Sequence, residues 1–511
     1  MQDVLVLIVG AGPTGLTLAV ELARDGVPFR LIETEPGPRP GSRGKGVQPR
    51  TLEIFEDLGI AERVIANGQL AIPMNSTAPD GHVTRGGAIP ESLANRPDIP
   101  YAASVITPQW RVEQALRLRL HQLGGTVEFG TTLAGFDQTD DGVTAQIVTD
   151  GTTTTVAARW LVGTDGGHSV VRKQLGVPFA GETREDVRMV LADLPVSGLD
   201  RQAWETWRHP AGIMSLCPLP STDLFQYAAT VTPDAQPRLG LADLQQTLED
   251  RTGRTDIRLH EPVWTSVWRA NIRLADHYRV GNVFLAGDAA HIHSPAGGQG
   301  MNTGIQDAHN IAWKFAAVVN DGAPAALLDT YEAERRPVAA HVLDLSNARL
   351  ATSIQTNAVP VERDASTIQL DVGYRGSVLA RDDRDDRVAL RAGDRAPDAT
   401  GLATVDGEHR LFALIGGGRF TLRSFGPVLP ATFPGITPRL LRLVKEPAVN
   451  GDIADPEDTL VTAYGAGDRT LVLIRPDGYL GLISDTGDVD AVSNYLGGRG
   501  DHRRLGSAPW Q

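Results

Sequence analysis

The stretch of sequence that decides the fold is residues 4–15, VLVLIVGAGPTG, in which six apolar residues run directly into a glycine-rich turn. An apolar run of this kind predicts a strand that is buried on both faces of a parallel sheet. Residues 16–24, LTLAVELAR, are rich in Leu and Ala and predict a helix after the turn. A second strand is expected at residues 28–32, directly before Glu33. This order of strand, turn, helix and strand indicates an α/β fold.

The glycines of this turn and Glu33 have the spacing of the dinucleotide-binding fingerprint. Gly10 permits the tight turn, Gly12 lets a pyrophosphate approach the backbone, and Gly15 lets the helix pack closely on the strand. Glu33 lies about 20 residues further on, where a carboxylate binds the ribose hydroxyls of an adenosine without a 2′-phosphate. The sequence therefore predicts an FAD or NAD site, rather than an NADP site, at this turn.

A second glycine-rich stretch lies at residues 279–308, RVGNVFLAGDAAHIHSPAGGQGMNTGIQDA. Residues 283–286 form an apolar run that predicts a buried strand, and Asp288 follows it, where a carboxylate can accept hydrogen bonds from sugar or ribityl hydroxyls. The next glycines bring bare backbone against a flat ligand, and a helix that starts near Met301 and Asn302 points its N–H groups at that ligand. Such a helix end stabilises negative charge, which a reduced flavin carries at one edge. We therefore expect a cofactor clamp here.

His291 and His293 form an HxH pair within this second stretch. A pair of this kind without acidic neighbours in the sequence is weak evidence for a metal site. We expect the two rings to pack inside the loop or to cap it, and the sequence predicts no metal.

The composition excludes several classes of function. The 511 residues are 41% hydrophobic, which is enough for two or three domains with separate cores. A net charge of -14, with no block of Lys or Arg, argues against nucleic acid as a partner. No apolar run reaches the ~18 residues of a membrane span, so we expect no membrane contact and a cytoplasmic location. Cys217 is the only cysteine, which excludes intrachain disulfides and thiolate zinc sites.

The predicted elements divide the chain into an interrupted nucleotide-binding domain and two further domains. Helices are predicted at residues 48–58, 109–123, 305–319 and 326–351, the last with a kink at Pro337. The FAD-binding domain is expected to comprise residues 1–73, 101–178 and 271–360, and a mainly-β substrate domain residues 74–100 and 179–270. A polar linker, residues 361–392, precedes a C-terminal domain at residues 393–511, with strands at 411–415, 470–475 and 479–483 and a helix at 488–496.

Three motifs in this order resemble those of the class A flavoprotein aromatic hydroxylases, which are single-component FAD monooxygenases. The motifs are GAGPTG with Glu33, TDGGHS around Asp165, and AGDAAHIHSPAGGQGMN around Asp288. The tail from Gly393 looks like the thioredoxin-like domain of the aromatic-polyketide and phenol hydroxylase branch, although it contains no cysteine and is therefore expected to be redox-inert. The resemblance implies an α/β fold with a Rossmann-like FAD-binding domain, an inserted mainly-β substrate domain and a thioredoxin-like C-terminal domain.

The resemblance also implies which residues contact FAD. The ADP half is expected on Glu33 and on the turn Gly10, Ala11, Gly12, Pro13, Thr14 and Gly15. The ribityl chain and the isoalloxazine ring are expected on Gly287, Asp288, Pro295, Gly298, Gly300, Met301 and Asn302. Gln109 matches a Gln near the FAD ribose, and Asp165 is implied to bridge FAD and the entry route of the nicotinamide.

Two residues are candidates for the catalytic centre itself. Pro295 is implied to lie beside the reactive C4a of the flavin, and Arg43 matches an Arg that contacts the flavin. Lys45 stands where the family often has a small residue, and from the sequence alone Arg43 is equally well a solvated loop residue.

The implied reaction is the hydroxylation of an aromatic ring. NADH or NADPH reduces FAD, O2 adds at the flavin C4a, and the hydroperoxide transfers oxygen to a phenolic or polycyclic polyketide-like substrate. A phenol is a better nucleophile when it is deprotonated, but the sequence identifies no base. Phe225 and Tyr227 alternate on one predicted strand and are candidate substrate contacts, with a place in the core as the alternative. A homodimer is compatible with the resemblance.

Two other classes of protein share this nucleotide-binding pattern. One is a flavin-dependent halogenase or dehydrogenase, although no Trp-x-Trp of the halogenase signature occurs and Trp264 and Trp268 are four residues apart. The other is a non-catalytic sensor that binds FAD or NAD. Flavin absorbance and phenol-dependent oxidation of NADPH would distinguish these classes from a monooxygenase.

Overall fold

The computed structural model describes residues 4–42, 44–87, 89, 91–294, 297–359, 364–384, 388–430, 432–433 and 436–497. Its first layer is a sheet with the strand order β18-β19-β11-β1-β2-β8, to which β9 and β10 add a hairpin beside β11. The bounds are β1 Val4–Val9, β2 Phe29–Glu33, β8 Glu128–Phe129, β9 Thr131–Thr139, β10 Gly142–Thr149, β11 Thr152–Gly163, β18 Arg279–Val280 and β19 Val283–Leu285. Strand β1 runs parallel to β2 and β11, and β11 runs parallel to β19. The predicted buried parallel strands are confirmed.

The glycine turn after β1 leads into α1 (Pro13–Arg24), which packs against α4 (Gln109–Gln122) and α7 (Gly300–Asn320). Gly10 has a φ of +103°, and a Cβ there would lie 2.6 Å from the carbonyl oxygen of Thr164. A Cβ on Gly15 would collide with the carbonyl oxygen of Gly10. Both positions therefore require glycine because of packing within the protein, as the fingerprint predicts.

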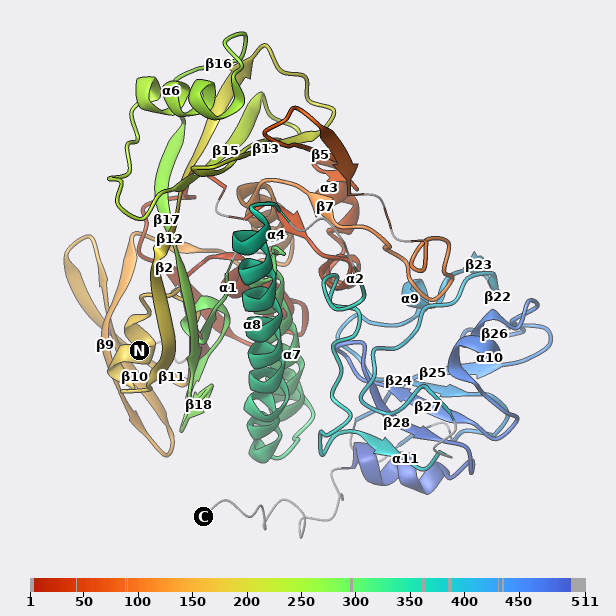
Figure 1. Ribbon diagram of the computed structural model, residues 1–511. Helices are drawn as coiled ribbons and strands as arrows, with labels where there is room; N and C mark the ends of the chain where they lie inside the picture. The colour runs from red at the N-terminus through yellow and green to blue at the C-terminus, as the bar shows by residue number, and fades with distance from the viewer. Residues whose placement is uncertain are drawn as a thin grey trace.

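A second sheet lies above the first layer, at the top of Figure 1, with the strand order β20-β17-β12-β15-β14-β13-β5-β6 and with β16 beside β12. The bounds are β5 Met74–Thr77, β6 Val83–Gly86, β12 Phe179–Ser197, β13 Trp204–His209, β14 Gly212–Pro218, β15 Leu224–Val231, β16 Arg258–Leu259, β17 Trp264–Ala275 and β20 His291–Ile292. Two segments far apart in the sequence thus share one sheet, because β5 pairs with β13. Helix α6 (Leu241–Thr252) contributes Leu244 and Leu248 to the apolar cluster on this sheet.

Shorter elements connect the two sheets. They are β3 (Gly46–Val47), β4 (Gln69–Leu70) and β7 (Val105–Ile106), which form a small sheet, with α2 (Pro49–Asp57), α3 (Ala61–Ala66) and α5 (Val170–Gln174). After α7 the chain forms the 3-10 turn η2 (Ala325–Asp329) and the long helix α8 (Thr330–Thr356), which continues through Pro337. In Figure 1, α7 and α8 stand at the centre of the molecule, between the first layer and the C-terminal sheet.

The C-terminal region forms a separate six-stranded sheet in the order β21-β28-β27-β24-β25-β26. The elements are β21 Arg381–Asp382, β22 Leu402–Thr404, β23 Gly407–His409, α9 Leu411–Leu414, β24 Thr421–Ser424, β25 Arg439–Leu443, β26 Asp452–Ile453, α10 Thr459–Tyr464, β27 Leu471–Ile474, β28 Leu480–Ser484 and α11 Val489–Leu496. The predictions for β27, β28 and α11 are confirmed.

The strand predicted at residues 411–415 is wrong, because this segment is the short helix α9. The Asp398 carboxylate accepts the backbone N–H of Phe412 at 2.9 Å, and this contact at the start of the segment favours a helical turn. The sheet instead uses β24 and β25, which the sequence pattern did not reveal. None of the helices in the described part of the chain has the length and apolarity needed to cross a membrane.

Candidate active site

The glycine turn of β1 and α1 leaves open space for a ligand at Gly12. The position that a Cβ on Gly12 would occupy has no heavy atom within 4 Å, so packing within the protein does not explain this glycine. No side chain caps the first turn of α1, and its free N–H groups suit an anion. Glu33 stands beside the same turn, because its Oε2 accepts the N–H of Ala11 at 2.8 Å. These residues fit the pyrophosphate and ribose of FAD.

Asp288 lies in the 3-10 turn η1 (Gly287–Ala289) directly after β19, and its side chain is exposed. Gly287 has a φ of +60°, and a Cβ there would lie 2.5 Å from Oγ1 of Thr14 at the start of α1. The two predicted cofactor motifs, one at each end of the FAD-binding part of the sequence, therefore touch in space. Asp288 therefore lies in a turn that packs against the start of α1.

Asn302, in the first turn of α7, joins two loops at the expected isoalloxazine position. Its Oδ1 accepts the N–H of Gln48 at 2.9 Å, and its Nδ2 donates to the carbonyl oxygens of Gly46 at 2.9 Å and Gly298 at 2.7 Å. Gln48 donates in turn to the carbonyl oxygen of Gly297 at 3.0 Å. The loop before α2 and the loop before α7 are therefore held as one unit. Gly300 and Met301 begin the same helix.

Gln109 and Asp165 stand at the border of this unit. Oε1 of Gln109 accepts the N–H of Gly44 at 3.0 Å, so Gln109 holds the loop that precedes β3. Asp165 follows β11, and its Oδ2 accepts the N–H groups of Val170 at 2.7 Å and Val171 at 3.2 Å. Burial raises the pKa of Asp165 above its ordinary value. Two other predicted site residues, Arg43 and Pro295, lie outside the described residues.

The structure places Phe225 and Tyr227 in the core of the inserted sheet, on the side of α6, where both are 1% exposed and pack with Leu244 and Leu248. This placement agrees with the alternative of a core position, and a role for the two rings as substrate contacts stays a prediction. Gln226, between them, faces the opposite way and donates to the carbonyl oxygen of Ser42 at 2.5 Å. The face of β15 toward the cofactor loops therefore carries Gln226.

A buried polar network behind the site was missed by the sequence analysis. His291 Nε2 lies 2.6 Å from Asp307 Oδ2, and Arg335 donates from Nε to Asp307 Oδ1 at 2.8 Å. His293 Nε2 lies 2.8 Å from His291 Nδ1. Burial lowers the pKa of His293 well below its ordinary value, so this ring stays neutral.

Asp307 also accepts the N–H of Gly287 at 3.0 Å, so the network supports the turn that carries Asp288. Burial acts to raise the pKa of Asp307, but the charges of His291 and Arg335 outweigh it and lower the pKa. The prediction that the two His rings pack inside the loop agrees with their burial. The sequence signal that could have revealed this network is the presence of charged residues, Asp307 and Arg335, inside helices that are otherwise apolar at those positions.

One group among the described residues has the spacing of metal ligands, namely Glu21, Asp57 and His309, whose ligand atoms lie within 4.8 Å of one another. Arg24 donates to both carboxylates, at 2.6 Å in the case of Asp57. Because this guanidinium already compensates the negative charge, we assign no ion to the group.

Similarity to known proteins extends over almost the whole chain. The FAD binding domain family matches residues 3–346. A flavin-dependent monooxygenase of Mycobacteroides abscessus is 43% identical, and the match covers 96% of this chain and 99% of the relative. A pentachlorophenol 4-monooxygenase of Sphingobium chlorophenolicum is 34% identical over 94% of this chain and 93% of the relative. The structure of aklavinone-11 hydroxylase in a ternary complex with FAD and aklavinone matches with a TM-score of 0.82 at 28% identity, over 97% of this chain and 99% of that one. The chain therefore belongs to the family of FAD-dependent monooxygenases.

Proposed function

We propose that this protein uses FAD, NADH or NADPH, and O2 to hydroxylate an aromatic substrate of the phenolic or polycyclic polyketide-like class. The observation that carries this proposal is the junction at Asn302, which joins the loop before α2 to the loop before α7 at the end of a helix aimed at the expected flavin ring. The inserted sheet lies against the loop before α2, because Gln226 donates a hydrogen bond to the carbonyl oxygen of Ser42. Relatives named for pentachlorophenol and aklavinone support the aromatic class.

Different residues of the chain are proposed to bind different parts of FAD. We assign the pyrophosphate to the turn from Gly10 to Gly15, the ribose hydroxyls to Glu33 and the ribityl chain to Asp288. The isoalloxazine ring is assigned to the segment from Gly298 to Asn302. Gln109 is assigned to the neighbourhood of the FAD ribose, and Asp165 to the region between FAD and the entry route of the nicotinamide. FAD, when bound, supplies the electron transfer and the activation of O2. The protein excludes water and holds the ring and the substrate in one orientation.

The same proposal extends to the domains. We divide the chain into an FAD-binding domain at 1–73, 101–178 and 271–360, a substrate domain at 74–100 and 179–270, a linker at 361–392 and a C-terminal domain at 393–511. The pairing of β5 with β13 supports the two-part substrate domain. A thioredoxin-like ancestry of the C-terminal domain, a homodimer and a cytoplasmic location stay predictions.

A single set of measurements tests the function. The purified protein is expected to carry the absorbance of FAD, and a phenolic substrate is expected to accelerate the oxidation of NADPH or NADH. With ¹⁸O2, mass spectrometry is expected to find one labelled oxygen in the product. Flavin without labelled product in the presence of any phenol would instead indicate a dehydrogenase, and protein without any flavin would refute the cofactor assignment.

A further inference from the structure

Lys45 connects the proposed flavin-binding loop to the inserted sheet. Its backbone belongs to the nucleotide-binding side, because its carbonyl oxygen accepts the N–H of Thr107 at 2.8 Å. The preceding residue, Gly44, is held by Gln109, and the following residue, Gly46, is held by Asn302. The Lys45 side chain extends the other way, toward the inserted sheet. It therefore runs from the proposed flavin-binding loop to the proposed substrate domain.

The Nζ atom of Lys45 lies against two residues of the inserted sheet. It donates a hydrogen bond to Oε1 of Gln226 on β15, and it lies 4.3 Å from the centroid of the Trp204 ring on β13. Among the described residues no carboxylate lies within 4.0 Å of this ammonium group, since Lys45 takes part in no ion pair there. An ammonium has three N–H donors, and Gln226 accepts only one. This half-buried cation thus has capacity for an anionic partner.

Lys45 lies against the face of the sheet opposite to the core of Phe225 and Tyr227, where Cys217 and Trp204 also pack against Ile72 and Ile106. Asp193 of β12 and Cys217 of β14 pair directly with Gln226 in the sheet, so their side chains share its face. Asp193 Oδ2 already accepts the N–H of Ser42 at 2.6 Å. The indole Nε1 of Trp204 is buried and contacts no acceptor among the described residues. An aromatic ring, an indole N–H without an acceptor and a cation therefore lie together on this face.

The titratable groups that share this face with Lys45 are Asp193 and Cys217. Burial lowers the pKa of Lys45 below its ordinary value, while Cys217 and Asp193 act in the opposite direction. Burial raises the pKa of Cys217 to about 11, so the thiol stays neutral at physiological pH. Burial also raises the pKa of Asp193, against its contacts with Ser42. A bound anion would restore the favourable environment that burial removes from the ammonium.

We propose that Lys45 is a catalytic residue that binds an acidic hydroxyl of the aromatic substrate in its phenolate form. The inference rests on the proposed function, and it names the group that favours the reactive state of the substrate. On binding, the O–H bond of the phenol breaks, the proton leaves to solvent and the electron pair stays on the oxygen, where the ammonium compensates its charge. No oxidant or reductant takes part in this step. The ring becomes more electron-rich before it meets the electrophilic oxygen.

The test uses the FAD-loaded protein and a panel of nitrophenols, whose anions absorb at longer wavelength than their neutral forms. Binding is followed by the change in the flavin spectrum, and the ionisation of the bound probe by its own absorbance, in buffer below the solution pKa of the probe. Lys45→Met removes the charge at similar length, and Lys45→Arg keeps it. Lys445→Met is the matched control, because Lys445 is exposed in the C-terminal domain. FAD content verifies that each variant is folded.

The wild type, Lys45→Arg and Lys445→Met are expected to bind the probe as its anion. Lys45→Met is expected to bind about ten- to a hundredfold more weakly, the range for a lost hydrogen bond to a charged group, and to show the neutral spectrum. If the wild type binds the neutral phenol, or Lys45→Met binds the anion as tightly as the wild type, the assignment is overturned while the proposed function stands. If no phenol binds to the FAD-loaded wild type, the phenolic substrate class fails and the role of Lys45 fails with it.

Discussion

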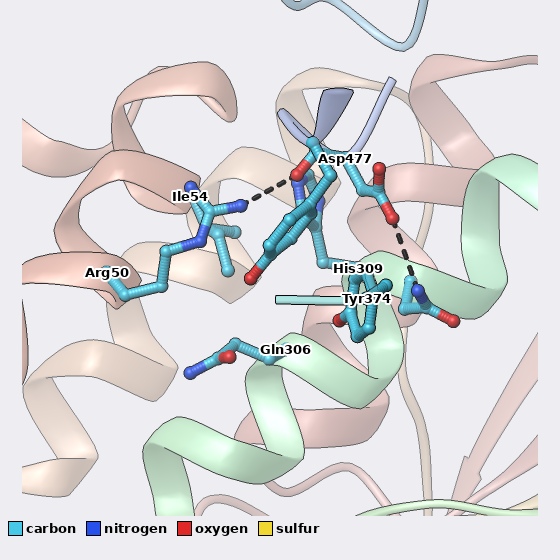
Figure 2. Close-up of a pocket in the computed structure, with 8 residues that line it drawn as sticks. Arg50, Ile54, Gln306, His309, Tyr374 and Asp477 are labelled. Atoms are coloured by element: carbon cyan, nitrogen blue, oxygen red, sulfur yellow. Dashed lines mark hydrogen bonds between the residues drawn. The ribbon is translucent and has the colours of Figure 1, made fainter. Parts of the chain in front are cut away.

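Arg475 of the C-terminal domain and Glu334 of α8 form a buried ion pair with two parallel hydrogen bonds, of 2.7 Å between Nη1 and Oε1 and of 2.9 Å between Nη2 and Oε2. Lys314 of α7 donates to the same carboxylate at 2.7 Å. The turn between β27 and β28 carries Asp477, whose backbone carbonyl oxygen accepts a hydrogen bond from Arg50 at 2.7 Å (Figure 2). The C-terminal domain is therefore joined by charge to α8 and, through the shared carboxylate of Glu334, to α7, whose first turn carries the proposed flavin contacts.

We predict that Arg475→Met lowers the free energy of unfolding by about 3–5 kcal/mol, because it leaves the carboxylate of Glu334 buried with fewer partners. Chemical denaturation followed by tryptophan fluorescence measures the change. Arg442→Met is the control in the same domain, since the pair of Arg442 with Asp452 is 47% exposed on the Arg side and is expected to contribute about 0–1 kcal/mol. Equal effects of the two substitutions would contradict a structural role for the buried pair.

The buried carboxylate also predicts a dependence of stability on pH. Burial acts to raise the pKa of Glu334, but the charges of Arg475 and Lys314 outweigh it and hold the pKa below its ordinary value. As the pH falls through the ordinary range of Glu, about 4.3, the unfolded chain takes up a proton that the native Glu334 does not, so stability declines. Glu334→Gln removes this proton uptake. Its free energy of unfolding should therefore change less steeply than that of the wild type between about pH 5 and pH 3, and parallel curves would refute the shifted pKa.

The two glycines of the first turn should respond differently to the same substitution. Gly12 has a φ of -73° and open space around it, so Gly12→Ala should fold normally and lose FAD affinity by about tenfold or more. Gly15→Ala brings a methyl group onto the carbonyl oxygen of Gly10 and should destabilise the fold by about 1–3 kcal/mol or more. Thermal unfolding and FAD titration of the apoprotein separate the two effects. Full FAD affinity in Gly12→Ala would place the pyrophosphate elsewhere.

Asp288→Ala is expected to weaken FAD binding about ten- to a hundredfold, because the ribityl hydroxyls lose a charged acceptor worth about 1.5–3 kcal/mol. The melting temperature of the apoprotein should change little, since the side chain is exposed. Asp141→Ala, in the turn between β9 and β10, is the exposed control and should leave binding unchanged. An Asp288→Ala protein that retains all its flavin would show that this carboxylate takes no part in binding FAD.

The sequence was sufficient to predict those elements that are determined by residues adjacent in the chain. The run from Val4 to Val9 and the glycines after it specify a buried strand and a tight turn without help from distant residues. A run of four or five apolar residues such as Leu411–Leu414 suits a strand or one helical turn equally well, and the helical turn that forms has the N–H of Phe412 bound to Asp398, 14 residues away. Local pattern cannot supply such a contact.

The same limit applies to the site. Alternation along β15 showed that Phe225 and Tyr227 share one face, but not which face α6 covers. The network of His291 and Asp307 joins residues that are 16 positions apart and lie on different elements. The role of Lys45 depends on a contact with Gln226, 181 positions away. Each of these relationships depends on the packing of elements that are distant in the sequence.

The position of Trp313 on α7 limits how the chain can be recombined with its relatives. Its ring meets Phe420 edge-on at 5.6 Å between centroids, and its Nε1 donates to Asp477 at 3.1 Å. A chimera that exchanges only the segment after the linker would pack the C-terminal sheet of a relative against α7 of this protein, whose Trp313 fits the native C-terminal sheet. Such a swap should succeed only when the donor also supplies the second half of α7, so the exchangeable module begins well before the boundary that the sequence suggests.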